Sequence, residues 1–288
     1  MHTIKIDEEK CIKCGLCIKD CIAKCIEFNE ANVPYMAHEE RCISCQHCLC
    51  ICPTGALSFD NKKAENSEKT DYNDILNLIK SRRSVRQFKE EEISEELMNK
   101  LKDMLHYIPT GCNSHSLHFT IVTKRAVMEE LRNKVNNKII NILTNKVFSP
   151  LTKKFARYKT AFLEGEDVVF RGAPHLVVVS SSITAPCATV DPIIALSYLE
   201  LYANHLGLGT CWCGYAQKCI KLFPELCQDL EIPSGYTPVY AMLLGIPSIS
   251  YQRTIQPEKY CINEISTLKK NEGCLFCKIK RIITNFLR

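Results

Sequence analysis

Hydrophobic residues between positions 74 and 245 follow two different periods, which predict alternating helices and strands. Apolar residues at helical spacing over 75–79 and 97–105 predict two amphipathic helices. Ser94, followed by two glutamates, supplies an N-cap and an acidic first turn for the second helix. Continuous apolar runs predict buried strands at 118–123, 175–180 and 239–245, and a buried helix over 193–206. Strands separated by helices indicate an α/β sheet covered on both faces.

The first 60 residues carry only short elements. The segments 26–28 and 33–35 predict a hairpin, and 56–59 predicts a closing strand. A module this small buries too little apolar surface to be comfortably stable alone. A polar stretch without apolar period follows and reads as a linker. The predicted organisation is a cysteine-rich domain over 1–60, a linker over 61–73, a second domain over 74–270 and a tail over 271–288.

Composition narrows the class of protein. The 288 residues carry 37 basic and 32 acidic side chains, a net charge of +5 that is too mixed to indicate nucleic-acid binding. The start lacks the apolar core of a signal peptide, and no apolar run has the length of a membrane span. Nineteen cysteines then predict a reducing compartment, where thiols bind metal or stay free. We expect a cytoplasmic protein of an anaerobic or low-oxygen cell.

Two cysteine runs give the strongest chemical signal. Each reads C-x2-C-x2-C-x3-C, and the second continues into proline. This is the ligand spacing of bacterial ferredoxins with two [4Fe–4S] clusters, in which the fourth cysteine of each run binds the other cluster. Soft thiolate ligands select such clusters. The predicted ligand sets are Cys11, Cys14, Cys17 and Cys52 for one cluster, and Cys42, Cys45, Cys48 and Cys21 for the other.

Zinc and disulfides are the competing interpretations of these cysteines. Zinc sites usually combine two C-x2-C pairs across a longer loop, and disulfides need a secreted context. Two details leave the ligand choice open. Cys21 is followed by Cys25 and lacks the proline, and Cys50 lies between two predicted ligands. Either Cys21 or Cys25 is therefore the eighth ligand.

Three segments of the second domain are hard to explain by packing alone. Residues 81–88 hold three arginines and two serines, which suit the binding of a phosphate, although a solvated basic face would look similar. Residues 108–115 form a turn-rich loop whose asparagine could pair with an amide edge, or simply connect two elements. Residues 207–214 begin with glycines that allow close approach of the backbone to a flat ligand, or end a helix.

The order of these motifs resembles the nitroreductase family of FMN flavoproteins. R-R-S-x-R is followed by P-x-x-x-N-S, a strand and G-L-G-T-C-W, over about residues 74–260. With the cysteine runs in front, the chain is similar to ferredoxin-domain nitroreductases of clostridia and anaerobic protists. The resemblance implies an α+β protein: a small 2[4Fe–4S] ferredoxin-like domain, then an α/β nitroreductase-like FMN domain with a mixed sheet covered by helices. It also implies a homodimer with FMN at the interface, bound by residues of both chains.

The resemblance assigns roles to particular residues. Arg82, Arg83 and Ser84 would hold the FMN phosphate and ribityl chain, with Arg253 closing on the phosphate. Arg86 would lie toward the pyrimidine side of the flavin, and Asn113 would hydrogen-bond the ring edge. The remaining predicted FMN-binding residues are Pro109, Thr110, Gly111, Gly207, Leu208, Gly209 and Thr210.

One position departs from the family pattern. His115 stands where the family often has glutamine, so it could donate to the flavin, donate a proton to substrate or fill the loop. No substrate-side aromatic is identifiable. Tyr158 and Phe162, at the end of a basic helical stretch over 128–163, are candidates for a lid.

We expect an FMN- and iron–sulfur-dependent oxidoreductase that reduces nitroaromatic or quinone acceptors. The donor would be NAD(P)H or reduced ferredoxin, and no separate dinucleotide-binding motif is present. Two other classes stay open: an electron-transfer subunit of a larger complex, and a non-enzymatic redox or iron sensor.

The remaining cysteines and the tail carry weaker signals. Cys274 and Cys277 form a lone C-x2-C, either a dithiol or half of a metal site between subunits. The amphipathic tail could touch a membrane surface, but packing on a partner subunit is the commoner use. Small core positions are expected for the other cysteines: Cys112, Cys187, Cys211, Cys213, Cys219, Cys227 and Cys261.

Overall fold

The computed structural model describes residues 4–21, 23–59, 61, 72–144, 158–251 and 260–267. The chain divides into a unit of residues 1–254 and a second unit of residues 255–288. The tail and its two cysteines lie outside the described residues. Within the part that is described, no helix combines the length and the apolar character that crossing a membrane requires.

The cysteine-rich module contains two small antiparallel ladders. Strand β1 (Ile4–Ile6) pairs with β4 (Leu57–Phe59), so the first and last strands of the module lie together. Strand β2 (Ile26–Phe28) pairs with β3 (Pro34–Met36), which confirms the predicted hairpin and closing strand. The module also contains α1 (Leu16–Lys19), η1 (Glu39–Arg41) and α2 (His47–Ile51). Three thiols belong to its small buried core: Cys17, Cys25 and Cys48.

A four-stranded sheet in the order β5-β6-β8-β7 organises the second domain. Its strands are β5 (Leu117–Val122), β6 (His175–Ser182), β7 (Gly209–Trp212) and β8 (Tyr236–Gly245). All three ladders are antiparallel, and the parallel pairing among the described residues is a single bridge between Ser84 and Thr210. The expected mixed sheet is thus almost wholly antiparallel. Long connections that carry helices, rather than tight hairpin turns, join these strands along the chain.

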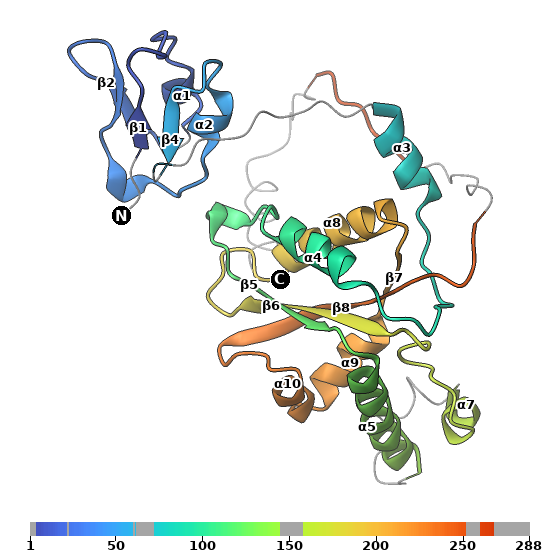
Figure 1. Ribbon diagram of the computed structural model, residues 1–288. Helices are drawn as coiled ribbons and strands as arrows, with labels where there is room; N and C mark the ends of the chain where they lie inside the picture. Colours follow the sequence, from blue (N-terminus) through green and yellow to red (C-terminus); the bar gives the residue numbers. More distant parts are fainter. Residues whose placement is uncertain are drawn as a thin grey trace, which may run out of the picture. The chain divides into compact units, whose positions relative to one another are not determined.

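Helices cover both faces of this sheet (Figure 1). One face packs against α4 (Glu95–Leu105) and α8 (Asp191–His205), and the other against α5 (Arg125–Thr144), α9 (Gly214–Leu222) and α10 (Glu225–Asp229). The central strand β6 is buried between these layers, as its run of four valine and leucine residues requires. The predicted coverage of both faces is confirmed.

Individual predictions of helices and strands fared differently. Ser94 caps α4, accepting from the backbone N–H of Leu97 at 3.4 Å, as expected. The helix over 75–79 is α3 (Tyr72–Ser81), but Ile75 and Ile79 are half exposed. The strand predicted as buried at 118–123 lies at the edge of the sheet and is mostly half-buried. Of the basic helical stretch over 128–163, the described parts form α5 and α7 (Lys159–Leu163), and residues 145–157 lie outside the described residues.

Candidate functional site

The eight predicted cluster ligands line two small cavities of the cysteine-rich module. The first thiol cavity is lined by the sulfur-bearing residues Cys11, Cys14, Cys17 and Cys52. The second thiol cavity is lined by Cys21, Cys42, Cys45 and Cys48, and by a fifth cysteine, Cys25. This division is the same as that expected from the spacing. The first cavity has four thiols and the second has five, so each has at least one thiol for every iron of a [4Fe–4S] cluster, which fits the chemistry of that group.

The thiols of the module differ in their electrostatic surroundings. Burial raises the pKa of Cys17, and it raises the pKa of Cys48 to about 11. Burial also acts to raise the pKa of Cys52, but hydrogen bonds from Thr54 and from backbone N–H groups outweigh it and lower that pKa. The described cysteines are free rather than disulfide-bonded. In the described part of the chain no three or more His, Cys, Asp or Glu side chains are grouped so that they could hold a metal ion.

A different cavity, which we call the basic cavity, lies at the end of β7 and the start of α9. It has a volume of about 320 Å³. Three cationic side chains line it, Arg86, Arg171 and Lys218, and one wall is the segment from Cys211 to Tyr215. This combination of positive charge and a backbone wall suits an anionic, flat ligand.

Two of the predicted flavin-binding segments meet beside the basic cavity. The N–H of Val85 donates to the carbonyl of Thr210 at 2.8 Å, next to the bridge from Ser84. Glycine is required on the second segment, because a Cβ on Gly209 would lie 2.9 Å from the side chain of Val85. The structure therefore brings the R-R-S-x-R and G-L-G-T-C-W motifs together, although they are more than a hundred residues apart.

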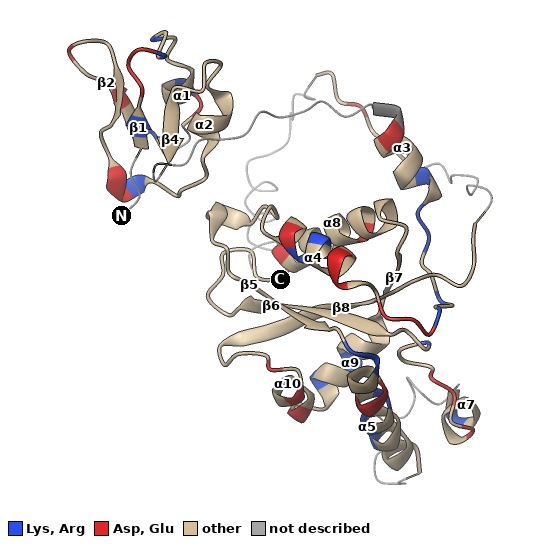
Figure 2. Cartoon of the chain, in the orientation of Figure 1, with Lys and Arg blue, Asp and Glu red and all other residues tan. Residues whose placement is uncertain are grey.

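The arginines of the first motif are only partly neutralised. Arg82 pairs with the nearly buried Glu200 of α8 at 3.0 Å. The Nη1 of Arg83 donates to two backbone carbonyls, while its Nη2 is buried without a hydrogen-bond partner. Arg86 donates to the carbonyl of Ser84 at 3.4 Å. Among the described residues neither Arg83 nor Arg86 has a carboxylate within 4.0 Å, although acidic residues follow in the chain (Figure 2).

The third predicted segment, the loop over 109–115, is held elsewhere. The N–H of Gly111 donates to both carboxylate oxygens of Asp191, at 3.1 and 3.0 Å, at the start of α8. A Cβ on Gly111 would lie 2.5 Å from the sulfur of Cys187, so the loop fits closely against its neighbours. The amide of Asn113 donates to the carbonyl of Ile43 at 2.9 Å, rather than pointing to an empty site.

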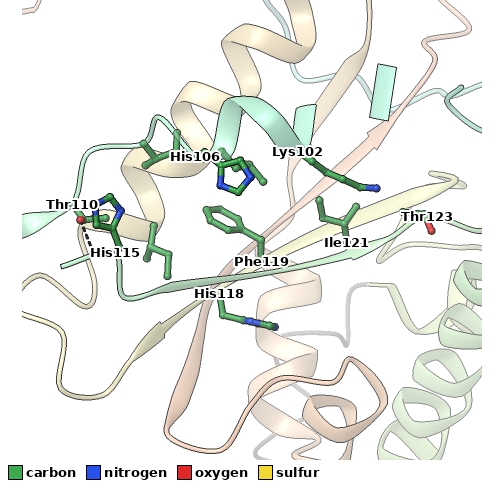
Figure 3. Close-up of a pocket in the computed structure, with 11 residues that line it drawn as sticks. Lys102, His106, Thr110, His115, His118, Phe119, Ile121 and Thr123 are labelled. Atoms are coloured by element: carbon green, nitrogen blue, oxygen red, sulfur yellow. Dashed lines mark hydrogen bonds between the residues drawn. The ribbon is translucent and has the colours of Figure 1, made fainter. Parts of the chain in front are cut away.

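This loop lines another cavity, of about 620 Å³, between α4 and β5. We call it the histidine cavity, because His106, His115 and His118 line it together with Lys102 and Thr110. Figure 3 shows His115 beside Thr110, whose hydroxyl accepts from the His115 N–H at 3.0 Å. His118 points away to the other side of its strand in the same view.

Of the predicted flavin-binding residues that the structure describes, Arg86 lines the basic cavity and Thr110 lines the histidine cavity, while the others line neither. Both segments are attached to α8, through Glu200 and Asp191. Nine residues separate these attachment points, roughly 14 Å along a helix that rises 1.5 Å per residue. Arg253 lies outside the described residues. Sequence reasoning did not identify Tyr215 and Lys218, because their place beside Arg86 depends on the packing of the sheet.

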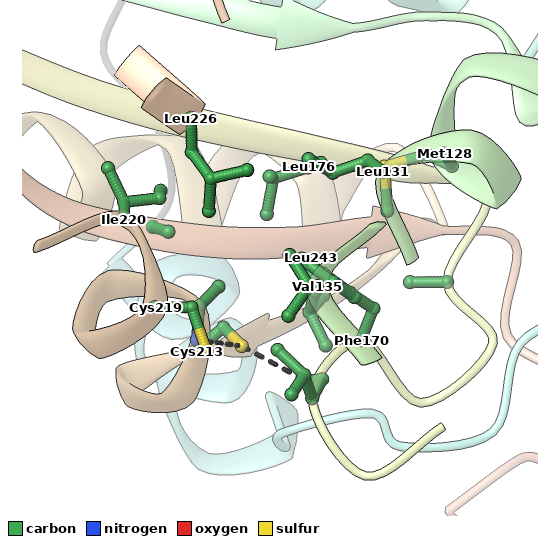
Figure 4. Close-up of a cluster of buried hydrophobic side chains, with 14 of the residues drawn as sticks. Met128, Leu131, Val135, Phe170, Leu176, Cys213, Cys219, Ile220, Leu226 and Leu243 are labelled. Atoms are coloured by element: carbon green, nitrogen blue, oxygen red, sulfur yellow. Dashed lines mark hydrogen bonds between the residues drawn. The ribbon is translucent and has the colours of Figure 1, made fainter. Parts of the chain in front are cut away.

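Several other sequence expectations are corrected by burial. Phe162 is fully buried in the core and does not fit a lid, whereas Tyr158 contacts Tyr215 of the basic cavity edge to face at 5.8 Å. Cys213 and Cys219 are core residues, as expected, and the thiol of Cys213 donates to the carbonyl of Val169 (Figure 4). Cys211 is also buried, and Cys187 and Cys227 are partly so. The expectation is wrong for Cys112 and Cys261, which are exposed.

Comparison with known proteins places the second domain in a family. The nitroreductase family model matches residues 79–246, which is more than half of the chain. An FMN-bound nitroreductase from Desulfitobacterium hafniense DCB-2 has 24% identity and a TM-score of 0.54, and the match covers 67% of this chain and 98% of that one. An FMN-bound nitroreductase from Bacteroides fragilis NCTC 9343 has 23% identity and a TM-score of 0.54, covering 68% and 100%.

A curated relative from Methanothermobacter thermautotrophicus, named NADH dehydrogenase/NAD(P)H nitroreductase, is 34% identical over 58 residues. That match spans 20% of this chain and 30% of the relative. Together with the family match, these findings define the class. The chain belongs to the nitroreductase family and is an oxidoreductase.

Proposed function

We propose that this protein is an oxidoreductase that binds FMN and two [4Fe–4S] clusters and reduces a nitroaromatic or quinone acceptor. The observation that carries the proposal is the basic cavity, where Arg86, Arg171 and Lys218 gather beside the joined flavin-binding motifs. The two solved structures with bound FMN support the cofactor. FMN would supply hydride or single-electron transfer, and the clusters would supply single-electron transfer.

The residues present fit an anionic cofactor. The buried, unpartnered Nη2 of Arg83 is a hydrogen-bond donor in need of an acceptor, and a phosphate oxygen would satisfy it. The hydroxyl of Ser84 would add a neutral donor. Arg86, Arg171 and Lys218 would stabilise negative charge on the ligand. Trp212, which belongs to β7 and contacts Tyr240 at 5.3 Å, would make the wall rigid.

A homodimer would explain why Arg86 and Thr110 line different cavities of one chain. If each site takes one segment from each subunit, Arg86 of one chain and the loop over 109–115 of the other need not meet within a single chain. Exposed apolar side chains support this assembly. Val190, Ile193 and Tyr198 of the α8 region are 54%, 37% and 50% exposed, on the helix that anchors both segments.

The donor and the direction of electron flow follow from one experiment. Full-length protein purified without oxygen is assayed for iron and FMN, and its visible spectrum is then recorded with NADH, NADPH or reduced ferredoxin. About eight irons and one FMN per chain are expected. Bleaching by NAD(P)H would identify a self-sufficient reductase, and bleaching only by ferredoxin would identify the clusters as the entry point. Zinc in place of iron, or no FMN after reconstitution, would contradict the proposal.

A pair of variants on one helix tests the basic cavity. Lys218→Ala removes a cation of the cavity, whereas Lys221→Ala removes an exposed cation one turn later on α9. We expect Lys218→Ala to raise the dissociation constant for FMN about tenfold, the effect of losing one charge-assisted hydrogen bond. Lys221→Ala should leave it unchanged. Equal FMN affinity of both variants, measured by fluorescence quenching, would remove the cavity from the binding site.

A further inference from the structure

The two halves of the cysteine-rich module repeat each other with an offset of 31 residues. Cys11 matches Cys42, and Cys21 matches Cys52. The backbone repeats as well. Lys13 and Ser44 both have left-handed φ angles, 55° and 57°, although neither is glycine. The strand after each run begins five residues beyond the fourth cysteine, at Ile26 and at Leu57.

The repeat identifies the partner of Cys25 as Ala56. Both residues are buried, with exposed fractions of 1% and 3%. Both also donate the same hydrogen bond: the N–H of Cys25 to the sulfur of Cys21, and the N–H of Ala56 to the sulfur of Cys52, each at 3.3 Å. Cys21 therefore occupies the position of the ligand Cys52, and Cys25 occupies a position where no ligand is needed.

The side chain of Cys25 is nevertheless part of the second thiol cavity. It lines the cavity together with the sulfur-bearing side chains of Cys21 and Cys42, one from each cysteine run. Among the described residues that line the first thiol cavity, the four predicted ligands are the only ones that contain sulfur. The two cavities are thus alike in their ligands and differ by one additional thiol.

We propose that Cys25 is a positioning residue that raises the reduction potential of the second cluster above that of the first. A neutral thiol can donate a hydrogen bond, and the predicted ligand sulfurs of Cys21 and Cys42 line the same cavity as the thiol of Cys25. A reduced cluster carries more negative charge, so donors to its sulfurs stabilise the reduced form. This proposal rests on the two clusters of the proposed function. It adds that the second cluster has the higher reduction potential and is therefore the preferred electron acceptor of the two.

The test compares three variants of the full-length protein by redox titration followed by EPR. Cys25→Ala makes the two halves alike at this position. It should keep the iron content and lower one of the two midpoint potentials by about 59 mV, a tenfold change in a one-electron equilibrium. Cys25→Ser keeps a donor and should restore most of the shift. Cys50→Ala, which removes an exposed cysteine of the same module, should change neither potential.

Three outcomes would overturn the proposal. Loss of half the iron in Cys25→Ala would make Cys25 a ligand rather than a donor to ligands. Unchanged potentials with full iron would show that the thiol does not act on the cluster. If Cys25→Ala does not fold, the reverse substitution still tests the proposal. Ala56→Cys places a thiol beside Cys52 and should raise the reduction potential of the first cluster. An unchanged potential in Ala56→Cys would contradict the proposal. Absence of iron in the unaltered protein would instead contradict the proposed function itself.

Discussion

At the scale of single residues, buried polar side chains show what holds the second domain together beyond apolar packing. His175, fully buried at the start of β6, accepts through Nε2 from the N–H of Ile93 at 2.9 Å, and its Nδ1 lies 3.2 Å from the carbonyl of Val122. This pattern requires a neutral ring with its proton on Nδ1. The imidazole therefore joins the edge strand β5 to the segment before α4, and protonation would leave Nε2 without its role as acceptor.

This burial predicts a specific pH dependence of stability. Burial lowers the pKa of His175 in the folded protein below the ordinary value of 6.5. Below pH 6.5 the unfolded chain binds a proton that the folded chain does not, so the free energy of unfolding should fall as the pH decreases and stay constant with respect to His175 above that value. Urea unfolding followed by the fluorescence of Trp212, the single tryptophan, measures this slope.

Two variants separate His175 from the other histidines. His175→Gln should lower stability overall and flatten the slope below pH 6.5, because the titrating group is gone. His106→Gln removes an exposed histidine and should keep the slope of the unaltered protein. The same slope in His175→Gln as in the unaltered protein would assign the pH dependence to another group.

At the scale of elements, α8 positions both candidate segments. Its first residue, Asp191, is 3% exposed and accepts from the backbone of the loop over 109–115, while Glu200 pairs with Arg82 two and a half turns later. A single helix thereby sets the spacing of two segments that are far apart in sequence. Positions on α8 that contact no ligand should then still affect cofactor binding.

Asp191→Ala tests this role. The variant removes the acceptor for the N–H of Gly111 and should loosen the loop, with a loss of about 1–3 kcal/mol of stability and about tenfold weaker FMN binding. Asp191→Asn keeps one carbonyl oxygen as acceptor, so its stability and FMN affinity should lie between those of the unaltered protein and Asp191→Ala. Calorimetric titration of apoprotein with FMN measures the affinity. Unchanged affinity in Asp191→Ala would show that the loop does not contribute to the flavin site.

At the scale of the whole molecule, assembly decides whether the two cavities cooperate. Tyr198 of α8 and Val127 of α5 are both 50% exposed, but they lie on helices that cover opposite faces of the sheet. We expect Tyr198→Asp to convert the proposed homodimer to monomers and to release FMN, because a charge would be buried at the proposed subunit contact. Val127→Asp should do neither. Light scattering with chromatography measures the mass, and a dimeric, FMN-loaded Tyr198→Asp would exclude this face as the interface.

Local patterns carried much of the fold. The hairpin of β2 and β3, the cap at Ser94 and the extent of β6, α8 and β8 follow from interactions within a few residues, so their signals lie in contiguous sequence. The burial of Phe162 and of the edge strand β5 was predicted wrongly, because it depends on contacts with distant parts of the chain. An apolar residue in a helix or strand does not reveal which layer will cover it, and burial depends on elements elsewhere in the chain.

The sequence alone determined the three closely spaced cysteines of each set, because the C-x2-C-x2-C spacing is a short-range property of the backbone. It also determined the order of the motifs typical of nitroreductases. Only the tertiary structure decided which residues share a cavity. The packing of β7 against the segment after α3 joined Arg86 to Arg171 and Lys218, and α8 held the loop with His115 at a different cavity. The same holds for Cys25. The offset of 31 residues pairs it with Ala56 in the sequence, but only the structure shows that its side chain lines the second thiol cavity.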